Sequence, residues 1–306
     1  MIFDSQYQIV AMPMIEVSDI KLARATAAAG IVPSLNTLNY DFGNMELSLL
    51  KDLREFNNDG NILLNFLANR IYQNYEAILK ILKAFKVKYI LLQYGDSTIN
   101  KNRLFDLVKR LKENDIKVFV SEHYNLNKMF PGIFDISDGV FVKGPGVAGI
   151  CRQYDNSLVE AVRNFRNQYD VPVIAVGGIG DKRDIDDVLE AGASAVGIGT
   201  LFAVSKESSI ADETKLRMVS SSSSDLIYLP VSKPEDPNYD GKQKALFFSE
   251  YSDKRNDIRN RNGLMLGVKN QGGHVYAGDG IDKVDEVLTV QEIVNRLVGL
   301  KGVIND

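Results

Sequence analysis

The sequence contains one cysteine and two histidines among 306 residues, and it has no long apolar or basic segment. The single cysteine, Cys151, excludes an internal disulfide and is typical of the reducing cytosol, so we expect a cytoplasmic protein. No apolar run approaches the roughly 20 residues that span a bilayer, and the first residues, MIFDSQYQIV, lack a signal-peptide pattern. The net charge of −4 comes without a basic stripe, which argues against nucleic acid as a partner. We predict no membrane partner and no metal site.

Short apolar runs alternate with amphipathic segments along the first two thirds of the chain. The composition, 45% hydrophobic and 25% charged, is that of a globular protein with a sizeable core. Eight runs are apolar on both faces, as strands buried in a parallel sheet are. The predicted strands are Tyr7–Ala11, Ile31–Leu35, Asn61–Leu67, Tyr89–Tyr94, Lys117–Ser121, Gly139–Lys143, Val171–Val176 and Ala195–Gly199.

Amphipathic helices are predicted between these strands. Apolar residues recur three and four positions apart in each helix, as do Ile78, Leu82 and Phe85. Eight strands that alternate with helices indicate parallel βαβ units, and eight units in about 220 residues have the size of a closed barrel. An open doubly wound sheet is the alternative, but no long break interrupts the eight units. We therefore predict an α/β fold, namely a (β/α)8 TIM barrel.

The pattern changes after the last predicted strand. Lys206–Val219 is the predicted eighth helix, and a serine run follows it. The next stretch, Pro230–Asn262, is polar and contains three of the eight prolines. Because it lacks the apolar residues of a separate core, we interpret it as a polar excursion or lid, with a mobile surface loop as the alternative.

These features divide the chain into two parts. Residues 1–220 form the predicted barrel, and residues 221–306 form a C-terminal extension packed on it. Within the extension we expect a polar loop or lid over 221–274, then a glycine-rich turn and a terminal helix over 275–300. The helix presents regularly spaced apolar residues with which it can dock on the barrel.

Two glycine-bearing loops follow the last two predicted strands. The seventh strand runs into Gly177 and Gly178, and the eighth ends at Gly199 and Thr200. Glycine has no Cβ, so backbone N–H groups in such loops can approach an anion closely. In (β/α)8 barrels the loops after strands seven and eight frequently bind a phosphate group. The glycines could serve only as tight turns, but two such loops at these strands favour a phosphate-bearing ligand.

Three segments carry a family resemblance. They are AMPMIEVSDIKLARATAAAGIVPSL from Ala11, VPVIAVGGIGDKRDIDDVLEAGASAVGIGTLFAVSKES from Val171, and VYAGDGIDKVDEVLTVQEIVNRL from Val275. Together they resemble the nitronate monooxygenase (2-nitropropane dioxygenase) family of FMN-dependent (β/α)8 barrels. The resemblance implies a flavoprotein oxidoreductase that acts on a small, nitronate-like substrate with oxygen or another acceptor. NAD(P)H remains an alternative electron donor. Separately, the polar excursion could pack on a neighbouring copy of the chain in a homo-oligomer.

The resemblance also implies where FMN binds. The glycine loops are expected to hold its phosphate, and the loop after the first strand is expected to lie against the isoalloxazine ring. Two polar residues at the ends of strands three and four are expected to contact the ring or the ribityl chain. The cofactor-binding residues that follow are Ala11, Met12, Pro13, Asn65, Gln93, Gly177, Gly178, Gly199 and Thr200.

The expected catalytic position departs from the family pattern. After the sixth strand the family carries a glycine-rich loop that ends in its catalytic histidine, whereas this loop reads KGPGVAGI and ends in Ile150. Isoleucine cannot accept a proton from a carbon acid. The two histidines of the chain, His123 after the fifth strand and His274 before the C-terminal turn, are the candidate replacements.

Lys143 and Cys151 are the other catalytic candidates. Lys143 ends the sixth strand, where a cation would stabilise an anionic reduced flavin. Cys151 follows a Gly-Pro-Gly loop that is similar to the loop bearing the nucleophilic cysteine of purine-nucleotide dehydrogenases and reductases, although two more residues intervene here. A lone cysteine is more often a small buried apolar residue. The sequence thus leaves three hypotheses: an active FMN-dependent oxidoreductase, a purine-nucleotide dehydrogenase-like enzyme, and a flavin-binding homologue without the ancestral chemistry.

Overall fold

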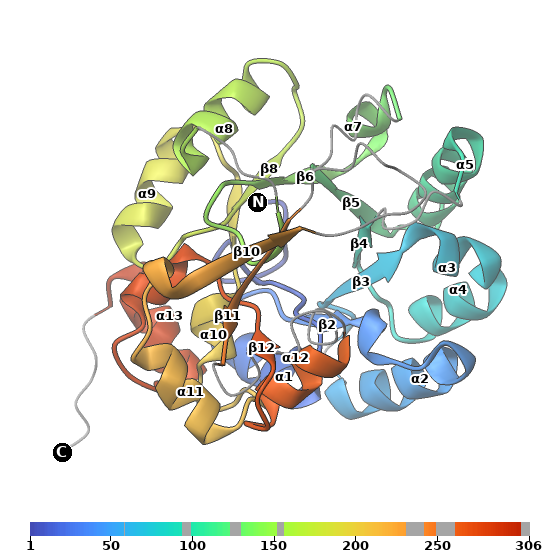
Figure 1. Cartoon of the computed structure of the whole chain (residues 1–306). Helices are drawn as coiled ribbons and strands as arrows, with labels where there is room; N and C mark the ends of the chain where they lie inside the picture. Colours follow the sequence, from blue (N-terminus) through green and yellow to red (C-terminus); the bar gives the residue numbers. More distant parts are fainter. Residues whose placement is uncertain are drawn as a thin grey trace.

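A computed structural model describes residues 1–57, 59–93, 99–122, 130–151, 156–230, 242–248 and 261–300. Eight parallel strands form one sheet in the order β1-β9-β8-β6-β5-β4-β3-β2. They are β1 (Ile9–Ala11), β2 (Ser34–Asn36), β3 (Leu63–Leu67), β4 (Tyr89–Gln93), β5 (Lys117–Glu122), β6 (Gly139–Lys143), β8 (Val173–Val176) and β9 (Ala195–Ile198). The two end strands meet where Val10 bridges Val32 in parallel, which brings the ends of the sheet together as a barrel. The predicted (β/α)8 barrel is confirmed (Figure 1).

Helices surround the strands on the outside of the barrel (Figure 1). They are α1 (Ile20–Ala28), α2 (Met45–Phe56), α3 (Ala68–Gln73), α4 (Tyr75–Ala84), α5 (Lys101–Lys112), α7 (Ile133–Ile136), α8 (Leu158–Arg166), α9 (Lys182–Glu190), α10 (Thr200–Ala203), α11 (Asp212–Val219) and α13 (Val290–Val298). Several begin at residues that satisfy free N–H groups of the first turn. Ser157, Asp181 and Thr289 each form a capping box, at α8, α9 and α13 respectively. These caps fix where three amphipathic helices begin.

Alternate residues of each strand pack into two different cores. Leu64 and Phe66 of β3 point outward to the layer between strands and helices, whereas Leu63 packs inside the barrel. Phe3 joins the inner core, with its ring stacked on Phe119 at 4.9 Å between centroids. Because side chains alternate along a strand, every second residue at the carboxyl end of a strand reaches the barrel mouth.

The eighth predicted helix is wrong in its first half. The structure has a short helix, α10, directly after β9, and α11 starts only at Asp212. The intervening segment is held by two other parts of the chain: the Lys206 N–H donates to the Leu288 carbonyl, and the Ala211 N–H donates to the Val268 carbonyl, each at 2.8 Å. These tertiary hydrogen bonds take the place of the helical ones that the prediction implied for this segment.

Strands also occur within residues 221–274, where the sequence predicts a polar loop. β10 (Leu226–Pro230) and β11 (Lys242–Phe247) pair antiparallel, and β12 (His274–Val275) adds to β11. A fourth strand, β7 (Gly149–Cys151), comes from the loop after β6 and also pairs with β11. A helix, α12 (Arg261–Val268), lies between β11 and β12 in the chain. The small second sheet therefore joins the C-terminal extension to the barrel, because β7 belongs to the loop after β6 and pairs with β11.

The predicted terminal helix is present as α13, where it packs against α1 and α9. Its buried residues are Val290, Ile293, Val294 and Leu297, which recur at the spacing of one helix face. In the described ranges, no helix is both long enough and apolar enough to cross a bilayer.

Candidate active site

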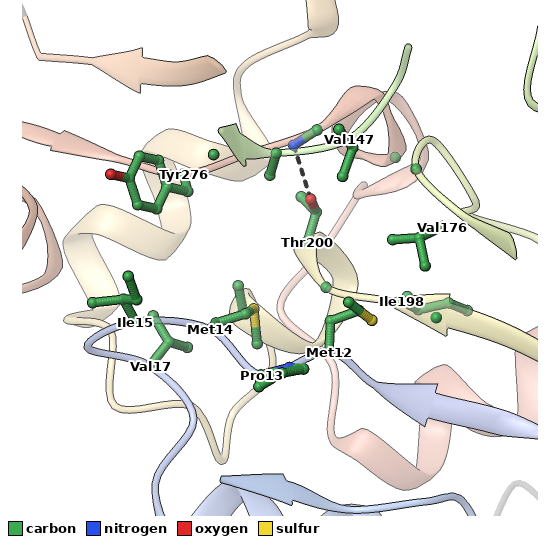
Figure 2. A pocket seen from close by; sticks show the side chains of 18 of the residues that line it. Met12, Pro13, Met14, Ile15, Val17, Val147, Val176, Ile198, Thr200 and Tyr276 are labelled. Carbon is green, nitrogen blue, oxygen red and sulfur yellow. Dashed lines mark hydrogen bonds between the residues drawn. The ribbon is translucent and has the colours of Figure 1, made fainter. Parts of the chain in front are cut away.

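A cavity of about 260 Å³ opens at the carboxyl ends of the barrel strands. Strand ends from around the barrel line it, together with the loop after β1, the loop between β6 and β7, and parts of the C-terminal extension (Figure 2). This is the face on which (β/α)8 barrels carry their active sites. The cavity joins two surfaces of different chemistry, one made of polar side chains and one made of backbone.

The polar surface consists of side chains at consecutive strand ends. Asn36 ends β2, Gln93 ends β4, Ser121 lies near the end of β5 and Lys143 ends β6, and all four line the cavity. Asn65 of β3 lies behind them, with its Nδ2 donating to the Asn36 Oδ1 at 3.0 Å. We call these five residues the polar arc.

Two buried oxygens of the polar arc have no hydrogen-bond partner in the described part of the chain. They are Oδ1 of Asn65 and Oγ of Ser121, which belong to residues that are 0% and 1% exposed. Buried polar atoms in native proteins nearly always have a partner, and leaving one unpaired costs about 1–3 kcal/mol. Ser121 lines the cavity, so a ligand with a polar edge could pair with its Oγ, whereas Asn65 lies behind the lining.

The backbone surface consists of the loops after β8 and β9. Gly177 and Gly178 have φ angles of +117° and +77°, in the region that favours glycine. A Cβ on Gly177 would lie only 2.8 Å from the backbone nitrogen of Val147, so glycine is needed for the loop after β8 to approach the loop between β6 and β7. At Gly199, in contrast, φ is −114° and the nearest atom of the described residues to a Cβ would be the Met14 sulfur at 3.6 Å. The protein's own packing therefore leaves the cavity wall at Gly199 open.

Thr200 joins the backbone surface to the C-terminal turn. Its Oγ1 accepts a hydrogen bond from the Gly278 N–H at 3.0 Å (Figure 2). A hydroxyl that accepts one hydrogen bond still has its own proton to donate. The Asp279 N–H donates to the Gly146 carbonyl at 2.9 Å, so the turn also holds the loop after β6. Thr200 is thereby oriented as a donor beside the open wall at Gly199.

A buried lysine of the second sheet holds the same turn. The Lys244 side chain is 2% exposed, its ammonium group forms an ion pair with Asp279, and it lies 5.0 Å from the centre of the Tyr228 ring. Burial alone lowers the pKa of Lys244, but its hydrogen bonds to Asp279 and Tyr228 raise the pKa above its ordinary value. The lysine therefore stays charged at neutral pH. Its ion pair with Asp279 connects β11 to the C-terminal turn beside the cavity.

Removal of the carboxylate at position 279 should reveal the strength of this attachment. Asp279→Asn leaves the ammonium group of Lys244 buried without its anionic partner, and we expect a loss of about 1–2 kcal/mol of unfolding free energy. The loss is smaller than for a fully buried pair because Asp279 is 39% exposed and screened by solvent. Urea unfolding at neutral pH measures it, and Asp186→Asn on the exposed face of α9 is the control.

The sign of the pH dependence follows from the raised pKa of Lys244. The pair stabilises the fold below the pKa of an unfolded lysine, and this stabilisation is lost only as the pH rises through the higher folded value. The difference between Asp279→Asn and the unchanged protein should therefore stay constant from about pH 6 to about pH 9. An Asp279→Asn protein as stable as the unchanged protein would contradict the assigned role of the pair.

The structure brings most of the sequence-predicted site residues together. Those that line the cavity are Met12, Pro13, Gln93, Lys143, Gly177, Gly178, Gly199 and Thr200. Asn65 is in the polar arc but behind the lining, and Ala11 faces the outer core. His123 lies outside the described residues. Asn36, Ser121 and Tyr276 line the cavity without having been predicted, and the strand-end argument that selected Asn65 and Gln93 could have found the first two.

Cys151 and His274 are both buried away from the lining of the cavity. Burial raises the pKa of the Cys151 thiol, although the nearby charges of Lys244 and Lys143 oppose that effect. His274 is stacked on the Phe247 ring at 5.0 Å. Tyr276 does line the cavity, and burial raises its pKa to about 12 despite a hydrogen bond from Gln243, so its phenol is protonated at neutral pH. Among the described residues, no three His, Cys, Asp or Glu side chains gather as a metal site requires.

Comparison with known proteins adds a family and a set of similar folds. The nitronate monooxygenase family model matches residues 67–299. FabK from Thermotoga maritima superposes with a TM-score of 0.77 at 20% identity, over 97% of this chain and 93% of that one. Nitroalkane oxidase from Streptomyces ansochromogenes gives a TM-score of 0.73 at 18% identity, over 96% and 95% respectively. None of the curated protein sequences matches this chain significantly.

Proposed function

Since this chain belongs to the nitronate monooxygenase family and is a barrel oxidoreductase, we propose that it binds FMN and oxidises a small, nitronate-like substrate. The observation that carries the proposal is the pairing of two surfaces in one cavity. Within the described part of the chain, the polar arc has a buried oxygen without a partner at the cavity, Oγ of Ser121, and the backbone surface has an open wall beside the Thr200 hydroxyl. FMN combines a hydrogen-bonding ring edge with a phosphate, so it suits both surfaces.

Each part of the cavity has a role in holding the cofactor. Backbone at Gly178 and Gly199 and the hydroxyl of Thr200 would hold the phosphate, because all three lie where the protein leaves the wall open. The polar arc would hold the polar edge of the ring, and Met12 and Pro13 would supply an apolar contact. When bound, FMN supplies the redox chemistry that carries electrons from the organic substrate to oxygen or to another acceptor.

Lys143 is the residue of this chain that best suits an anionic substrate or an anionic ring. Its side chain lines the cavity at the end of β6, so its positive charge acts over the barrel mouth. A nitronate is the conjugate base of a nitroalkane and has already lost the proton that a base would remove. The isoleucine at position 150, which has no proton-accepting group, is therefore compatible with nitronate oxidation, which needs no base at that position.

The visible absorption spectrum of the protein purified without added cofactor tests this proposal first. We expect flavin bands that bleach when an alkyl nitronate is added without oxygen. The matching neutral nitroalkane, added in the same way, tests whether a residue other than Ile150 removes its proton. The same experiment with NAD(P)H identifies the alternative electron donor. Flavin bands that bleach with none of these compounds would indicate a flavin-binding protein without the ancestral chemistry. A colourless protein that takes up no FMN would overturn the cofactor assignment.

Cys151 separates the proposed function from the purine-nucleotide alternative. In that alternative the thiolate attacks the purine, so Cys151→Ala abolishes turnover. We expect instead that Cys151→Ala keeps its flavin and its nitronate turnover within about twofold, because the thiol is buried and its raised pKa disfavours the thiolate. Stopped-flow assays of flavin reduction measure this, and a thiol reagent should modify Cys151 of the unchanged protein only slowly. Complete loss of turnover in folded Cys151→Ala would favour the alternative.

A further inference from the structure

Two methionine side chains of the loop after β1 bring sulfur atoms to the cavity. Met12 and Met14 both line it, and each is only partly buried (Figure 2). A thioether sulfur is soft and polarisable, and it is the atom of methionine that oxidants attack. The proposed function uses Met12 only as an apolar contact and does not use Met14. The two sulfurs are therefore reactive groups whose chemistry has no assigned role.

The Met12 sulfur occupies the place of a side chain of β9. A Cβ on Gly197 would lie 2.5 Å from the Met12 Sδ and 3.3 Å from the Met12 Cγ, so β9 carries glycine where the thioether packs. The Met14 sulfur lies beside the end of the same strand, where a Cβ on Gly199 would be 3.6 Å from it. Both sulfurs are thus next to the cavity wall at which the cofactor is expected.

Hydrogen bonds fix the backbone that carries the two sulfurs. The Met12 N–H donates to the Ile198 carbonyl at 2.9 Å, which continues the pairing of β1 with β9. The Ser18 hydroxyl accepts from the Met14 N–H at 2.8 Å and donates to the Met12 carbonyl at 3.2 Å. Ser18 is itself 3% exposed. Because this backbone is held in place, an oxygen atom added to either sulfur must be accommodated at the cavity wall.

We propose that Met12 and Met14 are oxidation sites at which hydrogen peroxide switches off cofactor binding. The oxidation itself needs only peroxide. Its role as a self-limiting regulation rests on the proposed function, in which oxygen is an electron acceptor. Oxygen that accepts two electrons and two protons becomes hydrogen peroxide, and in this enzyme the peroxide would form in the cavity that Met12 and Met14 line.

The reaction at sulfur is the transfer of one oxygen atom. A lone pair of the thioether sulfur attacks one oxygen of hydrogen peroxide, the O–O bond breaks, and the other oxygen leaves as water after a proton transfer. The sulfur is oxidised to a sulfoxide while the peroxide is reduced, so no further reactant is needed. Since the Met12 sulfur is packed on Gly197, the new oxygen must point into the cavity or force the side chain away from β9. Either result replaces an apolar contact with a polar one.

Peptide mass spectrometry of the holoprotein after treatment with hydrogen peroxide tests the two sites. Other methionines of the chain calibrate the reaction, because Met1 is 98% exposed whereas Met45 and Met218 are 2% and 0% exposed. We expect sulfoxide first at Met1, then at Met12 and Met14, and only much later at Met45 and Met218. Oxidation of Met12 and Met14 that is as slow as that of the two buried methionines would overturn the proposal.

Leucine variants connect the oxidation to cofactor binding, because leucine has about the same volume as methionine but no sulfur. Peroxide treatment should weaken FMN binding of the unchanged protein by about tenfold or more, since a polar oxygen then lies at an apolar contact. Compared with its own untreated state, the double variant Met12→Leu, Met14→Leu should lose no affinity, whereas the control Met218→Leu should lose as much as the unchanged protein. A loss that persists in the double variant would place the effect at another group, such as Cys151, and overturn the proposal.

Met12→Gln tests the same step without peroxide. Glutamine has a similar length and carries a polar group near the position of the sulfoxide, so this variant should bind FMN more weakly than Met12→Leu does. Flavin fluorescence quenching measures both affinities, and thermal unfolding of the cofactor-free proteins shows that each has folded. Equal affinities of the two variants would mean that polarity at this position does not control cofactor binding, which would overturn the switch.

Turnover of an alkyl nitronate in air, with catalase in solution, tests the regulation separately. Catalase removes the peroxide that leaves the cavity, so Met1 should stay unmodified while Met12 and Met14 gain sulfoxide and the rate declines. Sulfoxide formation with added peroxide, but without turnover of any nitronate, would support the two sites and overturn nitronate oxidation. Steady turnover in air with Met12 and Met14 unmodified would overturn the self-limiting role and leave nitronate oxidation standing.

Discussion

Replacing Gly199 with valine should weaken FMN binding by about 100-fold while the protein still folds, a change of ~2.7 kcal/mol in binding free energy. The fold tolerates the change because φ at Gly199 is −114°, which any residue adopts. A Cβ there would meet the Met14 sulfur at 3.6 Å and the Met12 Cβ at 3.8 Å, which are ordinary contacts. The added methyl groups would instead occupy the open wall where the phosphate is expected.

Flavin fluorescence quenching measures the affinity, and thermal unfolding of the cofactor-free protein shows that the fold is retained. Gly199→Ala should give an intermediate affinity, because it adds only the Cβ. Gly43→Val is the control, since a Cβ at Gly43 would have no atom of the described residues within 4 Å and Gly43 is not part of the cavity lining. If Gly199→Val bound FMN as tightly as the unchanged protein, the phosphate would have to lie elsewhere.

Gly267→Ala should destabilise the protein by about 3 kcal/mol, although alanine is the better helix former. Gly267 lies in the last turn of α12, where a Cβ would come within 1.9 Å of the His274 carbonyl oxygen. Helix propensity favours alanine by about 1 kcal/mol. The added methyl group must push α12 away from the buried strand β12, and this costs more free energy than the helix propensity returns. Overpacking of a filled core costs about 1–3 kcal/mol and sometimes exceeds that range. The close approach of α12 to β12 therefore makes the net effect of Gly267→Ala on the unfolding free energy destabilising.

Urea unfolding gives the free energy for Gly267→Ala, and the melting temperature should fall by roughly 5 °C or more. Gly43→Ala serves as the control and should change stability by less than about 0.5 kcal/mol. A Gly267→Ala protein more stable than the unchanged one would mean that α12 moves away from β12 at no cost.

The barrel strands could be predicted because their pattern is local. A parallel strand buried on both faces is a short apolar run, so Gly139–Lys143 was predicted with the bounds that the structure has. The second strand is displaced, from the predicted Ile31–Leu35 to Ser34–Asn36, with Pro33 between it and the bridge at Val32. Proline has no N–H to donate to a neighbouring strand, so a strand is disfavoured at Pro33. The apolar pattern alone does not show this missing hydrogen bond.

The candidate site was predictable only where the barrel itself determines position. Carboxyl ends of parallel strands meet at one face, so Gln93, Lys143 and Gly199 could be assigned to a common cavity from their places in the sequence. The same rule covers Asn36 and Ser121, which were overlooked because a single asparagine or serine after an apolar run is a weak signal. Tyr276 could not be found in this way, because it comes from the extension.

The sequence by itself determined the elements whose stabilising contacts are close along the chain. These include the apolar periodicity of the barrel strands and the capping box and apolar face that define α13. Only the tertiary structure decided that β7 pairs with β11, that Lys244 is buried against Asp279, and that α12 lines the cavity. The physical reason is that a lysine or glutamine in a polar stretch has no preference for burial until a distant partner offsets its lost hydration. In this protein those partners are supplied by loops of the barrel and by the C-terminal turn, which become neighbours only after the chain folds.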